Sequence, residues 1–284
     1  MSDSIDNVSP SYYINWTFDK HFILMQDIGN VSHLIGQLLG SFYGAGHTIT
    51  AIINFDDPNL IFSSLYFFSS FRGIIDSFIL DGNINTNGSR GSGIVGSIAH
   101  TSIIVNCINN ATTECFPCEY EAPFGIKVSA IASFNEGTIS HCINNGSMSG
   151  VARIAGIASD NSGQIINCIN TGKITSFNSG NGIFSGVGGI VGTSSNGHID
   201  ISNCINLGSI EGQGFVGGIV GLVNAGVSSP SPITNCINLG YVKGTNSIGG
   251  ILGMKWNYLG SITNCINTGV IEGEENVGSI VGKE

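Results

Sequence analysis

The sequence predicts an all-β chain folded as a triangular parallel β-helix of about seven to eight coils, preceded by a non-repeating N-terminal cap. One observation is an eight-residue motif that recurs along the chain, as ISNCINLG at 201–208, ITNCINLG at 233–240 and ITNCINTG at 262–269. Another is the glycine-rich element that follows each copy, such as Gly-Gly-Ile-Val-Gly at 217–221. The periodic segments are too short for helices, and Gly is too frequent for them, at 42 of 284 residues.

The N-terminal segment, residues 1–40, does not repeat, and we expect it to cap the repeat domain over 41–284. A solenoid needs its first open face covered by an atypical apolar segment. A short helix is expected around Ser32–Leu39. The aromatic residues available for the cap are Tyr12, Tyr13, Trp16 and Phe18.

The next segments lead into the repeat. Gly44 and Gly46 allow a tight turn, and residues 48–53 favour a strand. Two strand-like runs follow within residues 60–84, and the second aligns with the repeat so that Phe78 takes the cysteine position.

Each regular coil is expected to contain three short strands bounded by Gly, Asn or Ser. They are the Gly-x-Ile element, the Asn-Cys-Ile-Asn element and a short Gly-x-Ile or Gly-x-Val element. The spacing of the copies varies only in the connections at 111–126, 177–186 and 225–232, which are predicted to be loops projecting from the solenoid.

Equivalent residues of successive coils should stack in columns, because each strand pairs with its equivalents about 4.8 Å away. One isoleucine column is predicted to be buried and includes Ile190, Ile219 and Ile251. Two asparagine columns are predicted to form amide ladders along the axis. Their members are Asn203, Asn235 and Asn264 in the first column and Asn206, Asn238 and Asn267 in the second.

Cysteine recurs at one position of the repeat, in Cys107, Cys142, Cys168, Cys204, Cys236 and Cys265. In-register parallel strands point their Cβ atoms the same way, which leaves them further apart than a disulfide prefers. We therefore expect reduced thiols that pack as small hydrophobes. Strict alternation from Ile262 would point Cys265 outward, whereas a bend at Asn264 would turn it inward, and we favour the inward arrangement.

The remaining cysteines, Cys115 and Cys118, form the compact Cys-Phe-Pro-Cys motif. A zinc site would need a second pair of ligands at matched spacing, and a redox site would need a βαβ context. We prefer an inert loop or local disulfide and keep a metal half-site and a redox pair as alternatives. No cofactor is predicted.

Charge and composition exclude other classes. Nine Lys and Arg in a chain of net charge −10 cannot form the basic stripe of a nucleic-acid-binding protein. The most apolar stretch, residues 60–80, contains Arg72 and Asp76, and its uninterrupted part is too short to span a bilayer. Residues 1–20 lack the pattern of a signal peptide, so the chain as given would be cytoplasmic, or a mature or truncated form.

No catalytic residue is predicted, since aspartates such as Asp160 and Asp200 fall at unrelated repeat positions.

The combination of Gly249-Gly-Ile-Leu-Gly253 with GSITNCINTGVI at 260–271 resembles the GLUG-motif repeat family. The segment at 42–49 is similar to the entry segment that often precedes such repeats, so the resemblance covers about residues 40–282. It implies a right-handed β-helix in large secreted or surface-attached microbial proteins, including adhesin-like proteins and accessory regions of some IgA-directed peptidases. The chain departs from the family in lacking an export signal and a peptidase motif.

The function that we expect is a non-enzymatic structural or adhesive module, which binds a protein or glycan through the solenoid face and loops. A carbohydrate-active β-helix enzyme is the alternative, and carboxylates clustered within roughly 5–10 Å on one face would favour it. A third possibility is a fibre element that self-associates end to end through an open β-edge. The resemblance implies an extracellular or cell-surface location.

Overall fold

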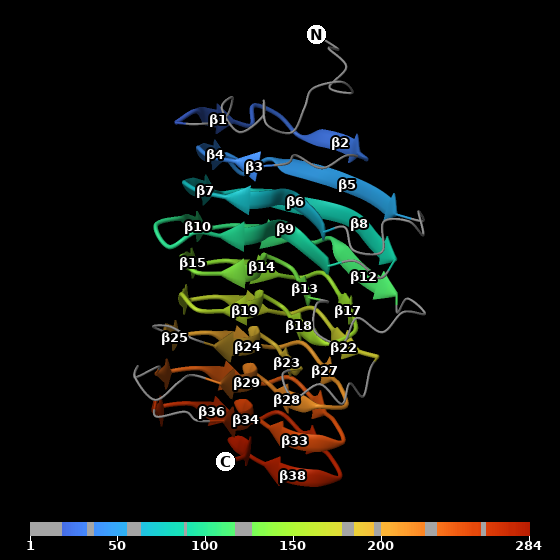
Figure 1. Ribbon diagram of the computed structural model, residues 1–284, viewed down its shortest axis with the longest axis vertical. Coiled ribbons are helices and arrows are strands. Elements are labelled where there is room, and N and C mark those ends of the chain that lie inside the picture. The colour runs from blue at the N-terminus through green and yellow to red at the C-terminus, as the bar shows by residue number, and fades with distance from the viewer. Residues whose placement is uncertain are drawn as a thin grey trace.

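The computed structural model describes residues 19–32, 37–55, 64–87, 90–116, 127–177, 185–195, 200–224, 232–256 and 260–284. Every regular element in these ranges is a β-strand, and all strand pairs are parallel. The strands stack as a β-solenoid of about seven turns, with the N-terminal coils at one end of the long axis and the C-terminal coils at the other (Figure 1). The predicted all-β, parallel β-helix fold is confirmed.

The first sheet, sheet A, has nine strands and contains the Ile-x-Asn part of the motif. Its strands follow the chain in order: β1 (His21–Ile23), β4 (Ser41–Tyr43), β7 (Ile74–Asp76), β10 (Ile103–Val105), β15 (Thr138–Ser140), β20 (Gln164–Ile166), β25 (Asp200–Ser202), β30 (Ile233–Thr234) and β35 (Ile262–Thr263).

Sheet B has 15 strands and begins after the cysteine position. Its first members are β2 (Ile28–Val31), β5 (Thr48–Phe55) and β8 (Ile79–Asn87). From β8 onward it divides into two rows. One row holds β11 (Ile108–Asn109), β16 (Ile143–Asn144), β21 (Ile169–Asn170), β26 (Ile205–Asn206), β31 (Ile237–Asn238) and β36 (Ile266–Asn267). The other holds β12 (Thr112–Phe116), β17 (Met148–Gly150), β22 (Ile174–Ser176), β27 (Ile210–Glu211), β32 (Val242–Lys243) and β37 (Ile271–Glu272).

Sheet C also has 15 strands and contains the glycine-rich element. It begins with β3 (Gln37–Leu38), β6 (Ser64–Phe71) and β9 (Arg90–Ile98). One row then holds β13 (Lys127–Ser129), β18 (Arg153–Ala155), β23 (Gly186–Gly188), β28 (Phe215–Gly217), β33 (Asn246–Gly249) and β38 (Glu275–Gly278). The other holds β14 (Ala132–Asn135), β19 (Ala158–Asn161), β24 (Val191–Ser195), β29 (Val220–Asn224), β34 (Leu252–Trp256) and β39 (Val281–Lys283).

The three expected strands per coil do not map one to each sheet. The Gly-x-Ile element lies in sheet C, the Asn-Cys-Ile-Asn element spans the bend from sheet A to sheet B, and the third element forms the second row of sheet B. In β8 the strand is continuous and carries Leu80 at the position that Asn109 occupies one coil later. Where asparagine is present, its side chain bonds to the backbone two residues ahead, as Asn144 Nδ2 does to Gly146 O at 2.9 Å. This local bond turns the chain and ends the first strand, because a short amide side chain competes with the ladder.

The prediction of a short helix around Ser32–Leu39 was wrong for the residues of this segment that the structure describes. Gln37 and Leu38 form β3, which pairs with β6. Residues 33–36 lie outside the described part of the chain, as do the cap aromatics in 1–18. The core that the structure does describe at this end is aromatic: Phe67 stacks on Phe78 with ring centroids 5.5 Å apart, and Phe42 meets Phe78 edge-on at 5.4 Å.

The core runs along the axis as columns of inward side chains. Ile190, Ile219 and Ile251 are fully buried, like their equivalents Ile94, Ile131 and Ile157. Phe78 lies in the cysteine column, since Ile79 pairs with Ile108. Because each coil adds the same small set of buried groups, stability accumulates along the stack.

One of the two asparagine columns expected to form ladders, that of Asn206, Asn238 and Asn267, forms an amide ladder along the axis. The whole ladder comprises Asn109, Asn144, Asn170, Asn206, Asn238 and Asn267, and the Nδ2 of each of the first five donates to the Oδ1 of the next coil at 2.8–3.0 Å. Asn109 Oδ1 has no donor, because Leu80 occupies the preceding position. The column of Asn203, Asn235 and Asn264 instead has positive φ, of 54–55°, and supplies the bend between sheets A and B. Asparagine suits that left-handed conformation better than most residues.

The glycine pairs are required by close backbone approach. A Cβ on Gly217 would lie 1.8 Å from Val220 O of its own turn. A Cβ on Gly218 would lie 2.2 Å from Gly250 O and 2.4 Å from Asn238 Cγ. The two repeated motifs are therefore linked physically, because the buried ladder amide packs against the second glycine of the pair.

Candidate functional site

The repeated cysteines point inward. Cys107, Cys142, Cys168, Cys204 and Cys236 are buried, Cys265 is half-buried, and all are free thiols. Each thiol contacts two carbonyls, as Cys204 Sγ does with Ser202 O at 3.3 Å and Ile165 O at 3.7 Å. The bend at Asn264, with φ of 54°, turns the following Cys265 toward the core.

Three buried thiols of the cysteine column, Cys142, Cys204 and Cys236, are poorly suited to nucleophilic chemistry. Burial raises the pKa of Cys142 and of Cys204 well above the ordinary value. Hydrogen bonding to Cys204 raises the pKa of Cys236 to about 12. Since the thiolate is the reactive form, these three side chains stay protonated and inert near neutral pH. At Cys168 burial raises the pKa, but hydrogen bonds from Cys142 and Cys204 lower it further than burial raises it.

The Cys115/Cys118 pair is only half described. Cys115 lies in β12 and is fully buried, whereas Cys118 lies outside the described residues. The metal half-site therefore stays a prediction. Among the residues that the structure describes, no three His, Cys, Asp or Glu side chains gather as a metal ligand set.

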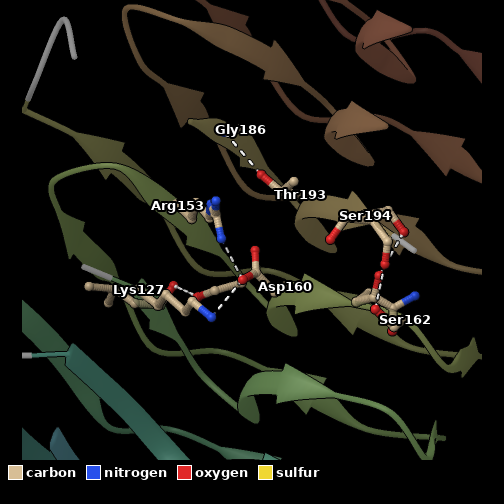
Figure 2. A network of polar contacts seen from close by, with 11 residues as sticks. Lys127, Arg153, Asp160, Ser162, Gly186, Thr193 and Ser194 are labelled. Carbon is tan, nitrogen blue, oxygen red and sulfur yellow. Dashed lines mark hydrogen bonds and ion pairs between the residues drawn. The ribbon is translucent and has the colours of Figure 1, made fainter. Parts of the chain in front are cut away.

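A buried ion cluster lies on sheet C. Asp160, on β19, is 4% exposed, and its Oδ2 accepts from Lys127 Nζ and Arg153 Nη1, each at 2.6 Å (Figure 2). Lys127 also lies over the Phe134 ring, 5.2 Å from its centroid. The other oxygen, Asp160 Oδ1, is buried and has no hydrogen-bond partner.

The ion cluster replaces a glycine contact. Arg153 precedes Ile154, which pairs with Val187, so Arg153 aligns with Gly186, and Asp160 aligns with Thr193. In the later coil Gly186 N donates to Thr193 Oγ1 at 3.3 Å, and a Cβ on Gly186 would lie 2.0 Å from Gly192 O. In the earlier coils the charged side chains fill a space between the two rows of sheet C. In the later coil that space is absent, because Gly186 lets the two backbones approach each other. We assign the cluster a packing role, because each of the two cations is paired with the buried carboxylate.

An open groove lies where the second row of sheet B meets sheet C. This corner groove has a volume of about 410 Å³. It is lined by Thr175, Ser176, Glu211, Gly212, Gln213, Lys243, Gly244, Thr245, Glu272, Gly273 and Glu274.

The groove floor is regular because the strands are in register. Thr175, Glu211, Lys243 and Glu272 pair in succession along the axis. Lys173 Nζ lies 3.2 Å from Glu211 Oε2, and Lys243 Nζ lies 2.8 Å from Glu272 Oε1, which gives a row of alternating charge. Tyr241 donates its hydroxyl hydrogen to Glu272. Hydrogen bonds from Lys243 and Tyr241 lower the pKa of Glu272.

The sequence did not indicate this groove. Its charged residues come from separate coils and form no motif, although Glu211, Lys243 and Glu272 all follow the third repeated apolar residue of their coil by one position. Aligning the repeats on Ile210, Val242 and Ile271 would have placed them in one row.

The described residues contain no helix with the length and apolar character needed to cross a membrane.

Comparisons with known proteins give one match. No family model and no curated protein sequence matches the chain. A similar solved structure is the crystal structure of a putative immunoglobulin A1 protease from Bacteroides ovatus, with 20% sequence identity, a TM-score of 0.46, and coverage of 92% of this chain and 77% of that chain.

The expectation of a chain without enzymatic activity is corrected at this point. The structure that it resembles bears the name of a protease, which contradicts that expectation. The expectation of no enzymatic activity was based on the absence of catalytic sequence motifs. Residues that come together only through the stacking of coils form no such motif. At this identity and TM-score the likeness assigns no activity to the chain.

Proposed function

We propose that the chain is a β-solenoid recognition module of a cell-surface or secreted protein, and that it binds a protein or glycan partner in the corner groove. The observation that carries this proposal is the row of polar side chains along the groove. Glu211, Lys243 and Glu272 are 37%, 51% and 57% exposed, so their hydrogen-bonding groups are available to a partner.

The geometry of the groove suits an extended partner. Successive coils place equivalent donors and acceptors about 4.8 Å apart. Gly212, Gly244 and Gly273 follow this row at the corner and also line the groove. A chain-like ligand with repeated hydroxyl or amide groups can meet several coils at once. The resemblance to GLUG repeats supports a surface location.

A binding screen tests the proposal. The intact chain is applied to glycan and extracellular-protein arrays beside a groove variant, Glu211→Ala with Lys243→Ala and Glu272→Ala. The control variant, Lys255→Ala with Glu284→Ala, removes a 3.9 Å ion pair outside the groove. We expect a ligand whose affinity falls at least about tenfold in the groove variant and is unchanged in the control. Equal binding by the groove variant and the unmodified chain would overturn the proposal.

A second candidate function is carbohydrate cleavage in the same groove, and the placement of two carboxylates favours it. Glu211 and Glu272 lie on either side of Lys243 in the register, so their Cα atoms are two strand spacings, or about 10 Å, apart. The carboxyl groups of inverting glycosidases are roughly 6.5–9.5 Å apart, a separation that side chains on these two backbone positions can reach. The hydrogen bonds from Lys243 and Tyr241 that lower the pKa of Glu272 keep it ionised, which is the state that the base of such a pair needs.

Oligosaccharide hydrolysis separates the two candidates. Reducing-end release is measured from an oligosaccharide panel with the intact chain, Glu272→Gln and the control variant. Turnover that Glu272→Gln abolishes supports the enzyme. Binding of a glycan without turnover supports the recognition module.

A further inference from the structure

A second open pocket lies at the opposite end of the solenoid, in the first described coils. This N-terminal pocket has a volume of about 440 Å³ and lies beside β1 and β4. Lys20, His21, Arg72 and Thr101 are among the residues that line it, and all four side chains are exposed.

The backbone around the pocket is well fixed. Ser41 N donates to Lys20 O at 2.8 Å, and Arg72 N donates to Leu38 O at 3.0 Å. Gly73 has φ of 143°, and a Cβ there would lie 2.2 Å from Gly40 O, so the coils touch at backbone distance. Lys20 and Arg72, distant in sequence, are therefore held on the same rim of the solenoid.

The cations of this pocket differ from most others in the chain. Five Lys and Arg side chains make ion pairs: Lys127, Arg153, Lys173, Lys243 and Lys255. Three others, Lys20, Arg72 and Lys283, have no ion pair within the described residues. Two of these three line the N-terminal pocket.

The local charge is therefore reversed relative to the molecule. The chain has a net charge of −10, whereas Lys20 and Arg72 outnumber Asp19, the acid that lines this pocket. An arginine fork presents paired N–H donors that match a carboxylate or sulfate, and a lysine adds a mobile point charge. The Thr101 hydroxyl can add a neutral hydrogen bond.

We propose that the N-terminal pocket binds an oxyanion group, a carboxylate or a sulfate, carried by a ligand. The site is independent of the corner groove, which lies in the C-terminal coils. Arg72 binds the anion in bidentate fashion, and Lys20 contributes charge from the adjacent rim.

The test is a titration of the intact ¹⁵N-labelled chain with sodium sulfate, sodium glucuronate and glucose. We expect sulfate, glucuronate or both to shift the amides of Lys20, Ser41 and Gly73, and glucose to leave them unchanged. Binding of one anion alone supports the site and identifies the group. Shifts as large with glucose, or no shifts with either anion, overturn the proposal.

Variants locate the interaction. Arg72→Gln keeps the backbone bond to Leu38 and should weaken binding at least about tenfold, with a smaller loss in Lys20→Gln. Lys283→Gln, a matched cation without an ion pair at the other end, should bind as the unmodified chain does. Unchanged binding in both pocket variants, or an equal loss in Lys283→Gln, contradicts the proposal. Unfolding midpoints establish that each variant is folded.

Discussion

At the residue scale, two asparagines of one motif have different tasks. Asn206 is buried, and its amide bonds to Asn170, Asn238 and Gly208 at 2.8–2.9 Å. Asn203 is exposed and has φ of 55°. We expect Asn206→Ala to lower the free energy of unfolding by about 3 kcal/mol, since several buried polar groups lose partners. Asn203→Gly should be nearly neutral, because glycine accepts positive φ. Urea unfolding compares them, and equal losses would contradict these roles.

The cysteine column makes stability depend on alkaline pH. Folding raises the pKa of Cys236 to about 12, whereas an unfolded thiol titrates near 8.5. Between these values the unfolded chain loses protons that the folded chain keeps, so stability must fall as pH rises. For each such thiol the fall is about 1.4 kcal/mol per pH unit.

Urea midpoints at pH 7, 8.5 and 10 measure this dependence. The midpoint should be similar at the first two values and lower at the third. Cys236→Ala should reduce the slope above pH 8.5. A slope unchanged by that substitution would mean that other groups cause the alkaline loss.

At the scale of the element, the glycine turn between the two rows of sheet C allows no side chain. A Cβ on Gly217 would lie 1.8 Å from Val220 O, whereas a Cβ on Gly29 in β2 would meet nothing within 4 Å. Gly217→Ala should therefore cost about 3 kcal/mol or more, because backbone must move. Gly29→Ala should cost less than about 1 kcal/mol. Thermal unfolding of the pair checks this, and similar midpoints would refute the close packing.

The ion cluster on sheet C gives a second prediction at this scale. Asp160→Asn leaves Lys127 and Arg153 largely buried without a counter-charge and should cost roughly 3–5 kcal/mol. A triple variant, Lys127→Met with Arg153→Gly and Asp160→Thr, adopts the residues that the next coil uses at two of these positions. It should be more stable than Asp160→Asn in urea unfolding. A triple variant that is less stable would show that the charges themselves stabilise the fold.

The sequence predicts the elements better than the sites. Periodicity is enough to place Phe78 in the cysteine column, because stacking forces equivalent residues together. It is not enough to tell which asparagine faces inward, since a bend at Asn203 reverses the alternation. The partners of Asp160 are also hidden, because Lys127 and Arg153 meet it only where two rows of sheet C pack together.

At the scale of the whole molecule, the repeated residues and the proposed binding sites lie in different places. The repeated Ile, Cys and Asn columns fill the interior, where each coil poses the same packing problem. The corner groove and the N-terminal pocket lie outside, where neighbouring coils differ in charge. Composition alone reports only the net charge of −10. It cannot reveal that Lys20 and Arg72 line the same pocket, because that depends on how the coils stack.

In-register stacking is the central claim, because it produces both the buried ladder and the groove. Asn110 follows the ladder residue Asn109, and Thr268 follows the ladder residue Asn267, which lies five coils further along the axis. Both Asn110 and Thr268 are exposed. Five strand spacings separate their backbones by about 24 Å. The direct measurement is the distance between nitroxide labels at these two positions, obtained by pulsed electron paramagnetic resonance. The account predicts one narrow distribution near that value, and a broad distribution or one centred beyond about 40 Å would contradict it.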